Sequence, residues 1–238
     1  MNRLILYPSD LLDDNRAFLT DRRAQHIRSV LKSQIGDSIR FGLLNGPLGL
    51  ASLAEDNESG LYLHLEYTDE KPTPHIPCTL VLALPRPKVA RRLIETICTL
   101  GVEQLHLINS YKVDKSYWQS RYLDEGKLQQ QLLLGLEQSG STHLPKIFQH
   151  QRFRPFVEDT FPELIGGKTA LLAHPYSEDE CPADIESPSV LVVGPEGGFT
   201  EFEVKLLEAQ GAMPVSLGKR ILRVETAVPA LIGRLHRF

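Results

Sequence analysis

Cysteine is scarce in this chain, and the three residues present, Cys78, Cys98 and Cys181, show no paired spacing. Their pattern argues against a disulfide framework and against a zinc site, and it fits a reducing compartment. The histidines are scattered without metal-ligand spacing, so we expect no metal centre. Neither Ser177 nor Ser216 lies in the sequence context of a nucleophile elbow, so nothing indicates a serine hydrolase.

Long apolar runs are missing as well. The first run is far too short for a signal peptide, and no later run could span a bilayer. We therefore expect a cytoplasmic protein without a membrane segment. The net charge of the 238 residues is −4, so the molecule as a whole is not a polycation. Any contact with nucleic acid must then come from local basic patches.

The first 71 residues favour β-structure. Short apolar stretches separated by turn signals predict one helix, at residues 22–31, and strands at residues 3–7, 37–43, 48–53 and 60–67. Several short strands of this kind indicate a small barrel. The proline-rich stretch at residues 71–77 cannot lie inside a helix or a central strand. We therefore place a linker there and expect two domains, residues 1–71 and 72–238.

After the linker, apolar strands alternate with helices. We expect strands at residues 78–84, 104–108, 169–173, 189–193 and 213–217. Helices are expected up to about residue 100 and at residues 124–138, 201–210 and 225–236. The helix at 201–210 is opened by a capping box, Thr200 with Glu203. This alternation indicates an α/β fold with a mostly parallel sheet covered on both faces.

Two glycine-bearing loops follow apolar strands late in the chain. The first glycine loop is residues 194–198, Gly-Pro-Glu-Gly-Gly, and the second is residues 217–227, Leu-Gly-Lys-Arg-Ile-Leu-Arg-Val-Glu-Thr-Ala. Neither matches a Walker loop or a GxGxxG fingerprint. In open α/β sheets, ligands lie beyond the carboxyl ends of the strands, where both loops are expected. They predict a small-molecule pocket beside an anion site, with ordinary strand-to-helix turns as the alternative.

Basic residues gather in two places that carry few acids. The first cluster contains Arg16, Arg22, Arg23, Arg28, Lys32 and Arg40. The second contains Arg86, Lys88, Arg91 and Arg92. Each can make a phosphate-contacting surface for nucleic acid, and for each the alternative is a solvated helix face. Glu137 and Gln138, at the end of a predicted helix, are weaker candidates for a site.

The two glycine loops together closely resemble the paired motifs of the RsmE family, which methylates N3 of a uridine in 16S ribosomal RNA of the bacterial small subunit. The resemblance covers nearly the whole chain, including residues 26–31 and 36–37 near the start and residues 100–102 and 137–138 in the middle. The chain departs from the family pattern at residues 109–112, Asn-Ser-Tyr-Lys, and after Gly140, where Ser141 and Thr142 follow. By the resemblance, these positions would lie near the RNA side of the site.

The resemblance implies a PUA-like RNA-binding β-barrel for residues 1–71 and a SPOUT methyltransferase fold with a deep trefoil knot for residues 72–238. It implies S-adenosyl-L-methionine as cofactor, a homodimer, and no metal. Cofactor contacts would come from His174, Gly194, Pro195, Glu196, Gly197, Gly198, Leu217, Gly218, Ile221, Leu222 and Thr226. RNA contacts would come from Arg16, Arg22, Arg23, Arg28, Lys32, Arg86 and Lys88.

On the same resemblance, Arg223 is the first choice for stabilising charge on the uracil oxygens, and Arg220 is the second. Glu225 would either orient Arg223 or help remove the N3 proton, and both roles stay open. Two other functions also stay open. One is a SPOUT methyltransferase acting elsewhere, such as on a ribose hydroxyl of transfer RNA. The other is a non-catalytic RNA-binding module with a vestigial pocket.

Overall fold

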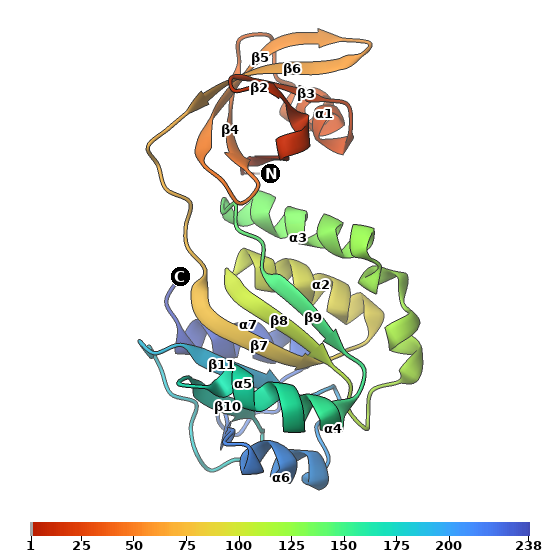
Figure 1. Ribbon diagram of the computed structural model, residues 1–238, viewed down its shortest axis with the longest axis vertical. Coiled ribbons are helices and arrows are strands. Elements are labelled where there is room, and N and C mark those ends of the chain that lie inside the picture. The colour runs from red at the N-terminus through yellow and green to blue at the C-terminus, as the bar shows by residue number, and fades with distance from the viewer. Residues whose placement is uncertain (1) are drawn as a thin grey trace. The chain divides into compact units, whose positions relative to one another are not determined.

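The computed structural model describes residues 2–238, which divide into two compact units (Figure 1). The first unit contains the chain up to Pro74 together with Leu133–Leu144. The second contains His75–Leu132 and Pro145–Phe238. The break near Pro74 falls within the proline-rich stretch, whereas the assignment of Leu133–Leu144 to the first unit was not predicted.

The first unit is built on a six-stranded sheet in the order β1-β4-β5-β6-β3-β2. The strands are β1 Leu4–Leu6, β2 Leu11–Asp13, β3 Arg16–Leu19, β4 Ser38–Leu43, β5 Leu48–Asn57 and β6 Gly60–Tyr67. Only β1 and β4 pair in parallel. The register of β5 shifts between Leu53 and Glu55, an irregularity that increases local twist and bending. In Figure 1 the sheet curls on itself, which fits the expected barrel.

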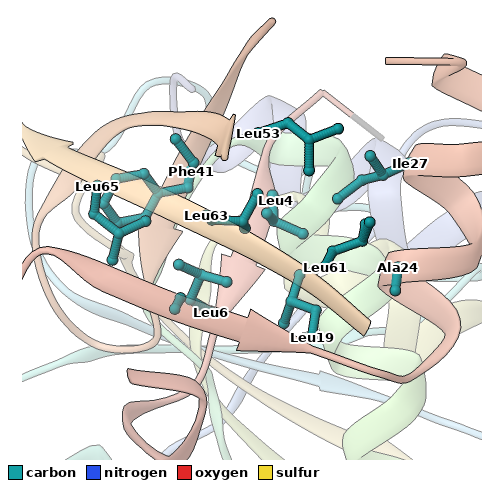
Figure 2. Packing of buried hydrophobic residues seen from close by; sticks show 12 residues of the cluster. Leu4, Leu6, Leu19, Ala24, Ile27, Phe41, Leu53, Leu61, Leu63 and Leu65 are labelled. Atoms are coloured by element: carbon teal, nitrogen blue, oxygen red, sulfur yellow. The ribbon is translucent and has the colours of Figure 1, made fainter. Parts of the chain in front are cut away.

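Period-two alternation explains how this sheet makes its core. Leu61, Leu63 and Leu65 of β6 all point inward, and each is nearly fully buried. Figure 2 shows them packed with Phe41 and with leucines of β1 and β3. Helix α1 (Arg22–His26) and the π-helical turn η2 (Ile27–Leu31) contribute Ala24 and Ile27 to the same cluster. A short 3-10 turn, η1 (Pro8–Asp10), follows β1.

The second unit contains a parallel sheet of six strands in the order β12-β10-β11-β7-β8-β9. The strands are β7 Ile76–Ala83, β8 Val102–Ile108, β9 Lys146–His150, β10 Thr169–Ala173, β11 Ser189–Val193 and β12 Met213–Val215. The three central strands, β10, β11 and β7, are apolar almost throughout because both faces are covered. The prediction of an α/β fold with a parallel sheet is confirmed.

Helices cover this sheet. The longer ones are α2 Pro87–Thr99, α6 Glu201–Ala209 and α7 Val224–Leu235. Helix α3, Glu125–Ser139, begins in the second unit, and its residues from Leu133 on belong to the first. Shorter turns are η3 Lys115–Gln119, η4 Arg121–Leu123, α4 Phe153–Pro155, η5 Phe156–Thr160 and α5 Phe161–Ile165. Helices α2 and α7 pack together, whereas α5 contacts β11 (Figure 1). Among residues 2–238, no helix combines the length and apolar character needed to cross a membrane.

Candidate active site

A cavity of about 830 Å³ opens at the carboxyl edge of the parallel sheet. Its walls come mainly from the segments that follow β10, β11 and β12, three adjacent strands. Residues of α2, α7 and the loop after β8 complete the lining. Parallel strands end at one edge, so segments far apart in sequence meet there. The volume is in the range of small-molecule and cofactor sites.

The first glycine loop is fixed by contacts from two other segments. One carboxylate oxygen of Glu196 accepts the backbone N–H of Arg86 at 3.0 Å. The carbonyl oxygen of Gly197 accepts a hydrogen bond from Lys112 Nζ at 2.7 Å. Gly198 has φ +68°, a left-handed conformation that favours glycine. The exposed carboxylate of Glu196 therefore joins the loop to the start of α2.

The second glycine loop follows β12: residues 217–223 have no regular structure, and residues 224–227 form the first turn of α7. Gly218 has φ +104°, and a side chain there would be strained even though nothing lies within 4 Å of its added Cβ position. Helix α7 begins at Val224, and Arg223 is its N-cap residue. The carbonyl oxygen of Arg223 accepts the backbone N–H groups of Thr226 at 2.9 Å and Ala227 at 2.8 Å, the first hydrogen bonds of the helix. The Arg223 side chain takes no part in capping.

Cations outnumber carboxylates around the cavity. Arg86, Lys112, Arg220 and Arg223 line it, against Glu196 and Glu225. Among residues 2–238, the ion pairs involve neither Arg220 nor Arg223. Both guanidinium groups are on exposed residues and remain available to a ligand. The amino end of α7 adds a partial positive charge at the same place, so the cavity suits an anionic ligand.

Most of the predicted pocket residues line this cavity. The structure brings together Arg220, Arg223 and Glu225 with His174, Gly194, Pro195, Glu196, Gly197, Gly198, Leu217, Gly218, Ile221 and Leu222. His174 donates its backbone N–H to Val215 O at 2.9 Å, which connects the end of β10 to β12. Thr226 is the exception, because it is exposed in the first turn of α7 and lies outside the lining.

Sequence reasoning missed several lining residues, including Val89, Tyr176 and Phe199. Lys112 lies in the loop after β8, among the residues 109–112 that the resemblance placed near the RNA side of the site, and it lines the cavity. Phe199 directly follows the first glycine loop, and a Cβ on Gly194 would lie 3.1 Å from its ring. That close approach explains why glycine stands at the start of the loop.

The predicted RNA cluster of the first unit is largely paired with carboxylates. Arg23 is only 4% exposed, and its guanidinium contacts Asp10 and Asp21, so a phosphate cannot reach it. The prediction that Arg23 binds RNA is therefore wrong. Arg16 pairs with Asp13 and Arg28 with Asp56 on the surface. Lys32 and Arg40 are exposed, as are Arg86, Lys88, Arg91 and Arg92 in the second unit.

Arg22 and Glu137 bind each other inside the first unit. Arg22 donates from both terminal nitrogens to the two carboxylate oxygens of Glu137, at 2.7 and 3.1 Å. The Glu137 side chain is nearly fully buried, and its backbone carbonyl accepts the N–H groups of Asn2 and Arg3. Glu137 therefore has a structural role, and it does not line the cavity of the second unit.

The chain was compared with protein families, curated relatives and solved structures. The family model for the RNA methyltransferase domain matches residues 71–236. Ribosomal RNA small subunit methyltransferase E of Treponema pallidum is 31% identical over 88% of this chain and 80% of its own length. The protein of that name from Synechocystis is 28% identical over 98% of this chain and 77% of its own length.

The fold of this chain also has a solved counterpart. It resembles the crystal structure of a ribosomal RNA small subunit methyltransferase E from Neisseria gonorrhoeae, which is bound to S-adenosyl methionine. The TM-score is 0.76 at 23% identity, with 97% of this chain and 95% of the other covered. The three comparisons agree: the family match, the treponemal relative and the shared fold. The chain belongs to the RNA methyltransferase family, in the group of ribosomal RNA small subunit methyltransferase E.

Proposed function

We propose that this protein transfers a methyl group from S-adenosylmethionine to N3 of a uridine in the 16S RNA of the small ribosomal subunit. One observation carries the proposal: two glycine loops enclose a cavity that holds two unpaired arginines, Arg220 and Arg223. The family supplies the reaction class, and relatives over most of the chain bear the name of the small-subunit enzyme.

The residues present fit the cofactor. Apolar side chains on two sides of the cavity, Val89 and Leu231 with Ile221 and Leu222, suit an adenine ring. Backbone groups of the glycine loops are accessible because Gly197, Gly198 and Gly218 carry no side chain over them. The carboxylate of the methionine part fits a lining with more cations than anions. When bound, S-adenosylmethionine supplies an electrophilic methyl group on a sulfonium.

The protein's own contribution is to position the uracil and to stabilise its anion. N3 of uracil carries a proton, and once that proton leaves, the negative charge spreads onto O2 and O4. Arg223, unpaired and exposed at the start of α7, can direct its guanidinium at those oxygens. Arg220, on the same loop, is the second cation within reach. Holding the acceptor in line can lower the barrier by about 7–11 kcal/mol.

Glu225 lies in the first turn of α7, two residues after Arg223, and it lines the same cavity. From there it can orient the Arg223 guanidinium or accept the N3 proton. Exchange of Glu225 for Gln separates the two roles, since an amide can still orient an arginine through its oxygen but cannot take up a proton. If the methylation rate lost in Glu225→Gln is recovered at high pH, Glu225 is the base that accepts the N3 proton.

We also propose the type of each unit, the oligomeric state and the cellular location of the protein. We infer that the first unit is a PUA-like RNA-binding barrel, supported by its curled six-stranded sheet. We infer a trefoil knot in the second unit from the resemblance of the two glycine loops to the paired motifs of the RsmE family. A homodimer acting in the cytoplasm, where ribosomal RNA is found, completes the proposal, and light scattering tests the dimer.

Nucleoside analysis by mass spectrometry tests the reaction. Purified protein, S-adenosylmethionine and 16S RNA, free or in the small subunit, should yield 3-methyluridine at one position. Methylation of a transfer-RNA ribose instead would overturn the assignment of substrate. Calorimetric titration with S-adenosylmethionine tests the cofactor separately, and absence of binding would leave only a non-catalytic RNA-binding module.

A further inference from the structure

The loop after β8, residues 109–113, is held in place from both sides. At its start, Asn109 donates its backbone N–H to His150 O of β9 at 2.9 Å, and Asn109 Oδ1 accepts the indole N–H of Trp118 at 3.1 Å. Near its end, Val113 N donates to Ser110 O at 3.1 Å, and the Val113 side chain is buried. We call this segment the β8 loop.

A buried carboxylate fixes the centre of the β8 loop. Glu203 of α6 is 3% exposed and uses one oxygen to cap its own helix, accepting the Thr200 N–H at 2.8 Å. Its other oxygen accepts the backbone N–H of Tyr111 at 2.7 Å. Hydrogen bonds to a buried carboxylate are short and strong, so the backbone of Tyr111 is well ordered.

Lys112 joins the β8 loop to the wall of the cavity. Its Nζ donates to Gly197 O at 2.7 Å, and its side chain packs so closely that a Cβ on Gly197 would lie 3.0 Å from Lys112 Cδ. Lys112 itself lines the cavity. The next residue back along the chain, Tyr111, therefore lies at the rim of the proposed methyl-transfer site.

The Tyr111 side chain has no structural role in the fold that would account for its position. It is 84% exposed, whereas its backbone is fixed on both sides. Within residues 2–238, none of the aromatic ring pairs includes it. A tyrosine offers a large flat surface at small conformational cost, because only two side-chain angles must be ordered. An exposed ring on a rigid backbone is what base stacking requires.

The charges nearby favour a nucleic acid over an apolar protein partner. Between β8 and α3 the chain carries three exposed cations, Lys112, Lys115 and Arg121, and two exposed carboxylates, Asp114 and Asp124. The cavity beside it is lined by three further arginines, Arg86, Arg220 and Arg223. Cations with an exposed aromatic ring between them bind the phosphates and an unstacked base of single-stranded RNA.

We propose that Tyr111 stacks on a base that flanks the target uridine and so presents the uridine to the cavity. Lys112 positions Tyr111 through its bond to Gly197, and the cations of this segment and of the cavity contact the backbone phosphates. The inference rests on the proposed function and deepens it, because a base inside a stack must leave it to be methylated. Tyr111 would thus be a residue that selects unstacked RNA.

Steady-state kinetics with 16S RNA test the inference. Tyr111→Ala should raise KM for the RNA about 5- to 150-fold, the loss of one base stack. Tyr111→Phe, which keeps the ring, should retain KM within about threefold. The affinity for S-adenosylmethionine should stay unchanged in both variants. Phe202→Ala is the matched control, because Phe202 is 62% exposed on α6 of the same unit but does not line the cavity.

Fluorescence gives a second readout that does not need turnover. Tyr111→Trp places an indole at the rim, and its emission should be quenched saturably by a single-stranded RNA oligonucleotide taken from the methylated region. Wild-type protein, with Trp118 alone, supplies the background.

The outcomes separate this inference from the proposed function. Normal methylation by wild-type protein, with an unchanged KM in Tyr111→Ala and no quenching in Tyr111→Trp, would refute the stacking role and leave the function standing. An equal rise of KM in Phe202→Ala, or a matching loss of cofactor affinity in Tyr111→Ala, would also refute it. If the wild-type protein methylates no ribosomal RNA, the function itself fails.

Discussion

Arg22 Nη2 lies 2.7 Å from Glu137 Oε1, although the two residues are 115 positions apart in the chain. Both belong to the first compact unit, since Leu133–Leu144 is part of it. The pair is asymmetric, because the Arg22 side chain is 36% exposed and the Glu137 side chain only 5%. Removal of the arginine therefore leaves a buried carboxylate without its partner, which is costlier than the loss of a surface ion pair.

We expect Arg22→Ala to lower the free energy of unfolding by about 1–3 kcal/mol, measured by urea denaturation. Arg28→Ala is the matched control, because Arg28 and Asp56 form a pair in which both side chains are about two-fifths exposed. Such a pair contributes about 0–1 kcal/mol. Equal effects of the two substitutions would contradict the structural role of Arg22. A double-mutant cycle with Glu137→Gln would then measure the coupling directly.

Arg23 is expected to be a folding residue and not an RNA contact. It donates to both oxygens of Asp10, with one bond of 2.9 Å, and also to Asp21, while Tyr7 packs on its guanidinium. Breaking a buried network of this kind costs about 3–5 kcal/mol. Arg23→Ala should therefore lower the thermal midpoint far more than Lys32→Ala, because Lys32 is exposed. Calorimetry of the two variants makes the comparison, and similar midpoints would count against the buried network.

The glycine loops could be recognised from sequence because their chemistry is local. The first loop follows β11, which lies at the residues expected for it. The second follows β12, which ends at Val215, two residues before the expected end. The contact between Lys112 and Gly197 could not be predicted, because Lys112 follows β8 and only the folded sheet brings it to the first glycine loop. The β9 strand was missed for a different reason. At the sheet edge it carries Lys146, Gln149 and other polar residues, so no apolar run marks it.

Burial explains the remaining errors. The arginines near residue 22 looked alike in sequence, but only the packed structure distinguishes buried Arg23 from exposed Lys32. The segment from Phe153 to Ile165 was not predicted as helical. It contains Pro155 and Pro162, which usually mark turns, and here they fall at the end of one short helix and the start of another.

Substitution of Arg223 separates catalysis from cofactor binding. Arg223→Ala should lower kcat by about 10²–10³, the cost of removing one donor that stabilises developing charge. S-adenosylmethionine affinity, measured by calorimetry, should change by no more than a few fold, because the cavity walls stay intact. A loss of affinity that matches the loss of rate would show that Arg223 holds the cofactor instead of the uracil.

A pair of histidines makes the fold sensitive to mild acid. His106 Nδ1 lies 3.0 Å from His150 Nε2, and the ring of His106 stacks between Phe148 and His150. Burial, followed by the charges of His150 and Lys168, lowers the pKa of His106 from 6.5 to about 4. Burial also lowers the pKa of His150. Both rings are therefore neutral in the folded protein near pH 7.

The unfolded chain takes up a proton at His106 more readily than the folded protein between pH 6.5 and about 4. The stability that the neutral ring contributes is thus present above pH 6.5 and is lost as pH falls through this interval. The full loss from His106 is about 3 kcal/mol.

Urea denaturation should show that the free energy of unfolding falls as the pH is lowered from 7 to 5. This interval lies above the range in which most carboxylates titrate. His106→Gln should flatten the slope, whereas His64→Gln, a change at an exposed residue, should leave it as in the wild type. A slope unchanged by His106→Gln would mean that other groups control the acid sensitivity.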